Sequence, residues 1–309
     1  MKYITDLSDF KINNSIVTLG KFDGNHIGHQ LLFRTSVSLK KPGDSAVIFT
    51  FDVQPMSVIS GVALQTIQTH DEKRFHGADE GIDYIVEFPF NKETMSTPPE
   101  DFVKKYLVDM LGVKAIVVGE DFRFGKNRGG NVELLKELGK EYGFEVYALE
   151  KVKYKGREVS STYIKEEIAK GNLDDVKNML GTSFSIMGPI LKGKQLGRTI
   201  GFPTINFAAP REKVLPPNGV YATYTVIDGE TFESISNVGI RPTFDDGEER
   251  TVETNIFDFD RDVYGKIAEV KFCTFIRAER KFSSADELME EIQRNTVQVK
   301  QWFEEHPEG

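Results

Sequence analysis

The stretch Gly20-Lys21-Phe22-Asp23-Gly24-Asn25-His26-Ile27-Gly28-His29-Gln30 decides the fold of the first half of the chain. A short β-prone run, 16–19, precedes it and a helical pattern opens at 31–33, so the glycines lie in a strand-to-helix turn. Unpaired N–H groups at a helix N-terminus favour an anion, and glycine lets the backbone approach it. His26 and His29, three positions apart, share one face if the helix has begun there. The stretch predicts a phosphate site.

Other interpretations of the two histidines stay open. They could be a structural pair in a turn, or half of a zinc site. Zinc is disfavoured because the chain has five His and one Cys, and no Cys-x-x-Cys stands nearby. The stretch matches neither the Walker loop nor the dinucleotide fingerprint.

Composition indicates a soluble chain of two domains. The 309 residues suit two cores, 39% are hydrophobic, 28% are charged, and no apolar run reaches the length of a membrane span. Residues 1–6 lack the pattern of a signal peptide, so we expect a cytoplasmic protein without a membrane partner. Cys273 is alone, which agrees with a reducing compartment. A net charge of −9 argues against a nucleic-acid partner.

The first half alternates strand-like and helical segments, which is typical of βαβ units and a parallel sheet. The expected strands after the opening one are 45–51, 82–88, 114–119 and 144–149, and amphipathic helices are expected at 99–111 and 132–142. Ligands gather at the carboxyl ends of such strands, where the opening motif, Asp52 and Gly119 would converge.

The opening motif resembles the His-x-Gly-His signature of the nucleotidylyltransferase superfamily. Its fuller form, Gly-x-Phe-Asp-Gly-x-His-x-Gly-His, resembles the FMN adenylyltransferase module of bacterial FAD synthetases. The resemblance implies a Rossmann-like domain in which His26 and His29 are catalytic. It also implies that the ATP phosphates are bound by Gly20, Phe22, Asp23, Gly24 and Gly28.

A loop with alternating aromatics follows the strand expected at 114–119. It contains Asp121, Phe122, Arg123 and Phe124. Taken alone, such phenylalanines are more often core residues than ligand contacts. The order resembles the Gly-Glu-Asp/Asn-Phe-x-Phe-Gly motif of the same family, which implies flavin binding by these four residues.

Ser160-Ser161-Thr162-Tyr163-Ile164-Lys165 begins another helix, and its hydroxyls could cap the helix or contact phosphate. It resembles the family motif Ser-Ser-Thr-x-Ile-Arg, which implies that Ser161, Thr162 and Lys165 bind ATP phosphates. Lys165 replaces the Arg of that motif and offers a point charge instead of a planar fork. A second departure is at 52–55, where Asp-Val-Gln-Pro stands in place of the usual Pro-His-Pro loop.

The character of the chain changes near Thr182, which predicts domains at 1–182 and 183–309. Short β-prone runs follow at 184–190, 219–227, 231–238, 251–259 and 267–276, with a hairpin signal at Asp228-Gly229. They predict a small antiparallel β-barrel. One helix closes the chain, with Ser284 and Glu287 as a capping box.

Within the β-domain, residues 193–206 read Gly-Lys-Gln-Leu-Gly-Arg-Thr-Ile-Gly-Phe-Pro-Thr-Ile-Asn. A glycine-rich loop in a β-protein is usually only a turn. The pattern resembles the Gly-Arg-x-x-Gly-Phe-Pro-Thr-x-Asn signature of riboflavin kinases, which implies ATP binding by Gly193, Gly197, Arg198 and Gly201. Thr204 and Asn206 offer hard oxygen ligands for Mg²⁺.

Strand alternation places Glu253, Asn255 and Phe257 on one face of their strand. The riboflavin kinase resemblance implies that Glu253 is the base that deprotonates riboflavin and that Arg277 lies near the flavin and the phosphates. The alternative for Glu253 is a solvated surface residue. Two departures are Asn255, where the family often has His, and Asn295, where it commonly has Asp.

These resemblances predict a bifunctional enzyme that makes FAD from riboflavin through FMN, with ATP as co-substrate and Mg²⁺ as cofactor in both reactions. FMN attacks with an anionic phosphate and needs positive charge, which His26, His29 and Lys165 would supply. Riboflavin attacks with a neutral alcohol and needs a base. Two alternatives remain. One is a riboflavin kinase whose first module is inactive or uses another phosphate ester, and the other is a flavin-binding regulator without turnover. The sequence leaves the oligomeric state open.

Overall fold

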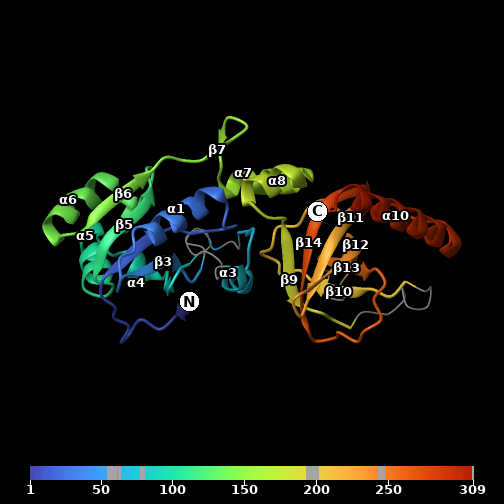
Figure 1. Cartoon of the computed structure of the whole chain (residues 1–309), viewed down its shortest axis with the longest axis horizontal. Helices are drawn as coiled ribbons and strands as arrows, with labels where there is room; N and C mark the ends of the chain where they lie inside the picture. The colour runs from blue at the N-terminus through green and yellow to red at the C-terminus, as the bar shows by residue number, and fades with distance from the viewer. Residues whose placement is uncertain (54–60, 62–63, 77–80, 193–201, 243–247, 308–309) are drawn as a thin grey trace. The chain divides into compact units, whose positions relative to one another are not determined.

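A computed structural model describes residues 1–53, 61, 64–76, 81–192, 202–242 and 248–307 (Figure 1). The chain forms two compact units, Met1–Ser161 and Thr162–Gly309. The boundary between these compact units lies between Ser161 and Thr162, which is earlier in the chain than the functional domain boundary that we expect near Thr182. The boundary near Thr182 stays a prediction.

The first unit alternates strands and helices, as expected for an α/β fold. Its strands are β1 (Lys2–Ile4), β2 (Ser15–Leu19), β3 (Ser45–Phe51), β4 (Tyr84–Phe88), β5 (Val113–Gly119), β6 (Glu145–Leu149), and the short pair β7 (Lys153–Tyr154) and β8 (Arg157–Glu158). Its helices are α1 (Ile27–Ser38), α3 (His70–His76), α4 (Lys92–Met95), α5 (Pro99–Phe102), the π-helix η1 (Val103–Val108), the 3₁₀ helix η2 (Lys126–Arg128) and α6 (Val132–Tyr142).

Six parallel strands form the sheet, in the order β1-β4-β3-β2-β5-β6, so the predicted parallel sheet is confirmed. Successive residues point to opposite faces, and both faces are buried. On one face Ile16 and Ile48 pack with Phe33 of α1. On the other, Val17 packs with Leu107 of η1. This two-sided core explains the continuous apolar runs.

The predicted helix over 99–111 is wrong in its detail. It begins as α5 but continues as the π-helix η1, in which the Asp109 N–H donates to the Lys104 carbonyl at 2.9 Å, five residues back. The apolar spacing of the sequence does not distinguish these two helix types.

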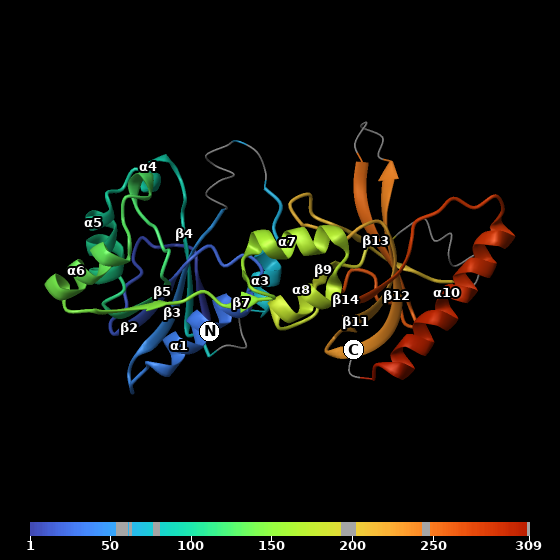
Figure 2. The same cartoon turned by 90° about the horizontal axis from the view of Figure 1, so that it is seen from above.

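The second unit begins with helices α7 (Ser161–Lys170) and α8 (Leu173–Leu180) and continues as a barrel (Figure 2). Its strands are β9 (Ser185–Pro189), β10 (Ile205–Ala208), β11 (Gly219–Ile227), β12 (Glu230–Pro242), β13 (Glu248–Ile256) and β14 (Ile267–Ala278), and α10 (Ala285–Glu305) follows. The strands are antiparallel in the order β10-β13-β12-β11-β14-β9. A bridge from Leu191 to Asn206 brings the two edges together. The predicted antiparallel barrel is confirmed.

Several hydroxyl side chains are buried in the barrel interior. The fully buried hydroxyl ladder consists of Thr223, Thr225, Ser234, Ser236 and Thr254, whose hydroxyls bond to one another at 2.7–2.9 Å. On the outer face, an apolar cluster of the strands packs against α10. The closing helix therefore covers the outside of the barrel.

The local signals for turns and caps are largely confirmed. Asp228 and Gly229 both have positive φ, 53° and 82°, and join β11 to β12 as a two-residue hairpin. The Ser284 hydroxyl accepts the Glu287 N–H at the start of α10. The second half of the predicted capping box is wrong, because the Glu287 carboxylate accepts the N–H of Ser283 instead.

Gly219 provides a test of barrel packing. Its φ is +154°, and a Cβ there would lie 2.4 Å from the Arg277 carbonyl oxygen, whereas a Cβ at Gly188 of β9 would meet nothing within 4 Å. We expect Gly219→Ala to destabilise the second unit by about 1–3 kcal/mol, the usual cost of overpacking. Denaturant unfolding followed by the fluorescence of Trp302, the one tryptophan of the chain, measures this. Gly188→Ala is the control, and equal midpoints for the two variants would contradict the expectation.

Candidate active sites

The loop between β2 and α1 has the strand-turn-helix geometry that its glycines predict. Phe22, Gly24 and Asn25 all have positive φ, at 47°, 95° and 42°. A Cβ on Gly24 would lie 2.8 Å from the side chain of Ile67, so the packing as well as the backbone favours glycine there. The helix begins at Ile27 with His26 as its N-cap residue. The N–H groups of the first turn are thus placed to meet an anion.

The two histidines lie together, although His26 precedes the helix. Their rings stack with centroids 3.5 Å apart, and His26 Nδ1 accepts the His29 N–H at 3.4 Å. Burial lowers the pKa of His26 to about 4, although Asp23 opposes this shift. Burial, His26 and Lys73 hold the pKa of His29 well below its usual range. Both rings are therefore neutral at pH 7 and would offer N–H groups instead of charge.

Asp23 and Ser161 hold the loop in shape. The buried Asp23 carboxylate accepts the N–H groups of Ile67 at 2.7 Å and Gln68 at 3.3 Å. The Ser161 hydroxyl donates to the Asp23 carbonyl at 2.7 Å. These contacts give both residues a positioning role in the loop. In the second unit, Thr162 is exposed and Lys165 is half-buried in the first turns of α7.

A pocket with about 430 Å³ of empty space, including its open mouth, adjoins this loop. Phe22, Phe33, Ile48 and Ile85 supply apolar lining, and the polar lining includes Asn25, Gln68, Lys73 and Glu87. The sequence prediction missed this pocket, because its residues come from five separate segments.

Glu87 is the buried acid of this pocket. His70 lies 3.4 Å and Arg74 3.1 Å from its two carboxylate oxygens, and both lower its pKa. The oxygens Asn25 Oδ1 and Gln68 Oε1 are buried without a hydrogen-bond partner among the described residues. An apolar floor with such polar groups suits a planar organic ring that carries hydrogen-bond donors.

The two phenylalanines of the aromatic loop after β5 differ in burial. Phe124 is 7% exposed and packs in the core at 5.9 Å from Phe102, while Phe122 is partly exposed and stacks on Phe124 at 5.8 Å. Arg123 is exposed, and Asp121 pairs with Lys151 at 2.8 Å. Phe122 therefore has the more accessible ring, and this ring packs against the buried ring of Phe124.

In the barrel, strand pairing aligns several candidate residues in one outer row. Asn206 pairs with Glu253, Glu253 with Asn237, Asn237 with Val220, and Val220 with Arg277. Directly paired residues point to the same face of a sheet. Glu253 is exposed. The row therefore displays a carboxylate, two amides and a guanidinium across four neighbouring strand pairs.

The remaining predicted residues of the barrel differ in accessibility. Asn255 is buried, and its side-chain amide donates to the Pro203 carbonyl at 2.7 Å. Thr204 is half-buried just before β10. Gly193, Gly197, Arg198 and Gly201 lie outside the described residues, as do Gln54 and Pro55.

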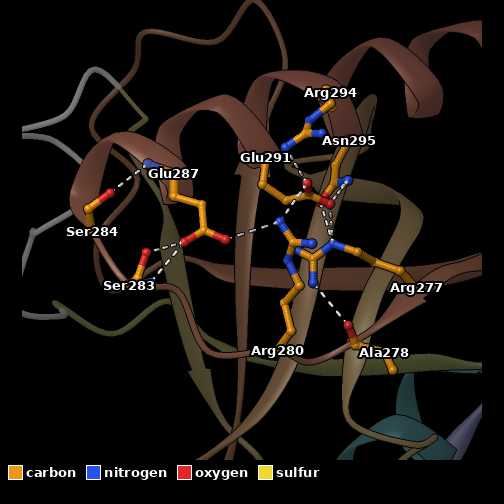
Figure 3. A network of polar contacts seen from close by, with 9 residues as sticks. All are labelled: Arg277, Ala278, Arg280, Ser283, Ser284, Glu287, Glu291, Arg294 and Asn295. Atoms are coloured by element: carbon orange, nitrogen blue, oxygen red, sulfur yellow. Dashed lines mark hydrogen bonds and ion pairs between the residues drawn. The ribbon is translucent and has the colours of Figure 1, made fainter.

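Arg277 is held by a network that the sequence prediction missed (Figure 3). Its Nε donates to Asn295 Oδ1 at 2.8 Å and lies 3.1 Å from Glu291 Oε1. Its Nη1 donates to the Ala278 carbonyl at 2.9 Å. The one available signal was the spacing of Glu291 one helical turn before Asn295.

The described His, Cys, Asp and Glu side chains contain no group of three suited to a metal. The zinc interpretation of His26 and His29 thus finds no third ligand in the described ranges. A Mg²⁺ ion bound mainly by ATP phosphates needs only one or two protein oxygens. Asn206 fits that need, because it pairs with Glu253 on the same face.

Comparisons with known proteins agree with this two-site arrangement. Residues 9–163 match the family model described as FAD synthetase, and residues 180–303 match the one described as riboflavin kinase. A bifunctional riboflavin kinase/FMN adenylyltransferase of Buchnera aphidicola from Schizaphis graminum is 34% identical, covering 98% of this chain and 99% of the relative. The protein of that name from Escherichia coli K12 is 33% identical, with 97% and 96% covered.

A solved structure from Streptococcus pneumoniae, described as a macrolide-efflux protein, matches with a TM-score of 0.86 and 31% identity. It covers 97% of this chain and 99% of that one. Across the part of this chain that the structure describes, we find no helix with the length and apolarity to cross a membrane. On the full-length matches, this chain belongs to the family of bifunctional riboflavin kinase/FMN adenylyltransferases.

Proposed function

We propose that this chain makes FAD from riboflavin in two steps, each in its own domain. The observation that carries the proposal is the coincidence of two separate family matches with two separate candidate sites. Residues 183–309 phosphorylate riboflavin to FMN, and residues 1–182 adenylylate FMN. We expect both reactions in the cytoplasm.

In the adenylylation, a phosphate oxygen of FMN attacks the α-phosphorus of ATP. A new P–O bond forms, the bond to the β-phosphate bridging oxygen breaks, and pyrophosphate leaves. The attacking phosphate is already anionic, so no base is needed. The neutral rings of His26 and His29, with the N–H groups at the start of α1, donate hydrogen bonds to the developing charge. Lys165 is the cation that we assign to the phosphates.

The organic parts of the substrates need separate surfaces. The half-exposed Phe122 offers an aromatic face for the isoalloxazine ring, and Arg123 is exposed beside it. The pocket lined by Asn25 and Gln68 is the surface that we assign to a ring of one substrate, because the side-chain oxygens of these two residues lack hydrogen-bond partners among the described residues. The Asp23 carboxylate, which accepts the Gln68 N–H, holds one edge of this pocket in place.

In the phosphorylation, a riboflavin hydroxyl attacks the γ-phosphorus of ATP. The O–P bond forms, the β–γ bridge breaks, ADP leaves, and the hydroxyl proton passes to the Glu253 carboxylate. Asn206 and Thr204 would hold Mg²⁺, which screens phosphate charge when bound. Arg277 lies in the same outer row as Glu253 and would stabilise the transferred phosphoryl group.

Incubation of the full chain with riboflavin, ATP and Mg²⁺, followed by chromatography of the flavins, tests the proposal. FMN and FAD together are expected. FMN without FAD, even when FMN is supplied, would leave only the kinase, and neither product would leave a flavin-binding protein. Omitting Mg²⁺ in the presence of a chelator should stop both conversions.

We expect His29→Ala to lower FMN adenylylation by on the order of 10²–10³, the usual loss for one charge-stabilising donor. Riboflavin phosphorylation should stay unchanged, because its site lies in the other unit. Both rates are measured on one preparation, and the exposed His306 provides the control variant His306→Ala. Equal loss of both activities in a folded variant would defeat the assignment.

We expect Glu253→Gln to reduce riboflavin phosphorylation by roughly 10²–10⁴, the usual range for a general base, because Gln keeps the shape but cannot take the proton. Riboflavin and ATP binding should change little, and supplied FMN should still become FAD. Glu233→Gln alters another exposed carboxylate on a barrel strand and serves as the control. Wild-type phosphorylation in the Glu253 variant would show that Glu253 is only a solvated residue.

A further inference from the structure

We propose that Glu291 is a positioning residue for riboflavin phosphorylation, because it holds the guanidinium of Arg277 in place on the outer row of the barrel. The inference rests on the proposed kinase site and adds a residue that neither the motifs nor the family matches assign. Glu291 acts through Arg277 and does not itself touch substrate.

The Glu291 carboxylate is the centre of a polar network at the first turns of α10 (Figure 3). It is only 8% exposed. Its Oε1 lies 3.1 Å from Arg277 Nε and accepts a hydrogen bond from Asn295 Nδ2 at 3.2 Å. Its Oε2 lies 2.9 Å from the Nη2 atoms of both Arg280 and Arg294. Each of the two carboxylate oxygens therefore has two polar partners.

The charges in this network make the carboxylate necessary. Three guanidinium groups surround Glu291, and a second carboxylate, that of Glu287, lies 3.8 Å from Arg280. Burial raises the pKa of Glu291, but Asn295 and the three arginines outweigh that effect and lower it. Without the negative charge, Arg277 would face Arg280 and Arg294 with no compensation, and repulsion would move it.

The contacts of Arg277 leave one end of its guanidinium available. Nε is used by Glu291 and Asn295, and Nη1 donates to the Ala278 carbonyl. Nη2 makes no hydrogen bond or ion pair with a described residue, and the guanidinium carbon lies 5.7 Å from the centroid of the Phe282 ring. A guanidinium fixed at two nitrogens points the third in a defined direction, which is what recognition of a phosphate oxygen requires.

The position of Asn295 offers a second place from which a carboxylate could pair with Arg277. Its Oδ1 accepts from Arg277 Nε at 2.8 Å, closer than the Glu291 oxygen. Asn295→Asp would therefore place a negative charge on the same nitrogen from one helical turn further along. The double variant Glu291→Gln with Asn295→Asp moves the charge while keeping the size of both side chains.

The test compares the kinase kinetics of full-length variants. We expect Glu291→Gln to lower kcat/KM for riboflavin phosphorylation by about 10- to 100-fold, the range for losing a hydrogen bond to a charged group. Arg277→Ala should cost at least as much. The double variant Glu291→Gln with Arg277→Ala should be no slower than Arg277→Ala alone, because Glu291 acts through Arg277. Glu291→Gln with Asn295→Asp should recover most of the lost rate.

Three controls separate this inference from others. FMN adenylylation, measured on each preparation, should stay at the wild-type rate. Glu287→Gln changes a carboxylate that contacts Arg280 and Ser283 but not Arg277, and it should leave phosphorylation unchanged. The Trp302 unfolding midpoint checks that α10 is folded at the assay temperature.

Two results would overturn the inference. The first is wild-type phosphorylation in Glu291→Gln. The second is a double variant with Arg277→Ala in which the two losses multiply, since this would show that Glu291 acts independently. A wild-type protein that makes no FMN from riboflavin would instead remove the proposed function itself.

Discussion

The ladder of buried hydroxyl groups fixes the register of β11, β12 and β13, and the outer row of the barrel depends on that register. Thr223, Ser236 and Thr254 satisfy one another inside the barrel, where an unpaired hydroxyl would cost about 1–3 kcal/mol. A slip of one residue would leave these groups unpaired and would also turn Glu253 into the interior. The hydroxyls inside the barrel thus determine which side chains stand outside it.

The first unit is constrained in another way. Its loop passes through positive φ at Phe22, Gly24 and Asn25 to bring the chain from β2 into α1. Only glycine adopts such angles without cost, so the two other residues are held by their surroundings. Asp23 supplies part of that support through the N–H groups of Ile67 and Gln68. The residues of the motif therefore determine the backbone conformation of this loop as well as supplying its polar side chains.

The sequence predicts the parts of this structure that local patterns encode. The glycine-rich turn, the Asp228-Gly229 hairpin and the Ser284 cap each involve neighbours in the chain, and all three are present. The pairing of Asn206 with Glu253 is not local, so the sequence could suggest both residues but not that they share one face. Resemblance to known families supplied what periodicity could not, namely the substrates.

Other features were beyond local prediction for physical reasons. Phe122 and Phe124 look equivalent in the sequence, and it is packing against Phe102 that buries one of them. The π-helical turn of η1 keeps the same apolar spacing as an α-helix. Glu291 reads as an ordinary charged residue on an amphipathic helix, because two of its three arginine partners, Arg277 and Arg280, precede α10 and meet Glu291 only in the folded barrel.

The two units treat buried titratable groups in opposite ways, and the difference follows from what surrounds each group. Burial lowers the pKa of both His26 and His29, and the charge of Asp23 opposes this shift at His26 only in part, so both rings are neutral at pH 7. Glu291 is also buried, but three guanidinium groups keep it ionised. In the first unit we therefore expect phosphate to meet uncharged donors, namely the backbone N–H groups at the start of α1 and the two imidazole rings. In the second unit we expect the positive charge to come from Arg277, which pairs with the buried Glu291 carboxylate at 3.1 Å.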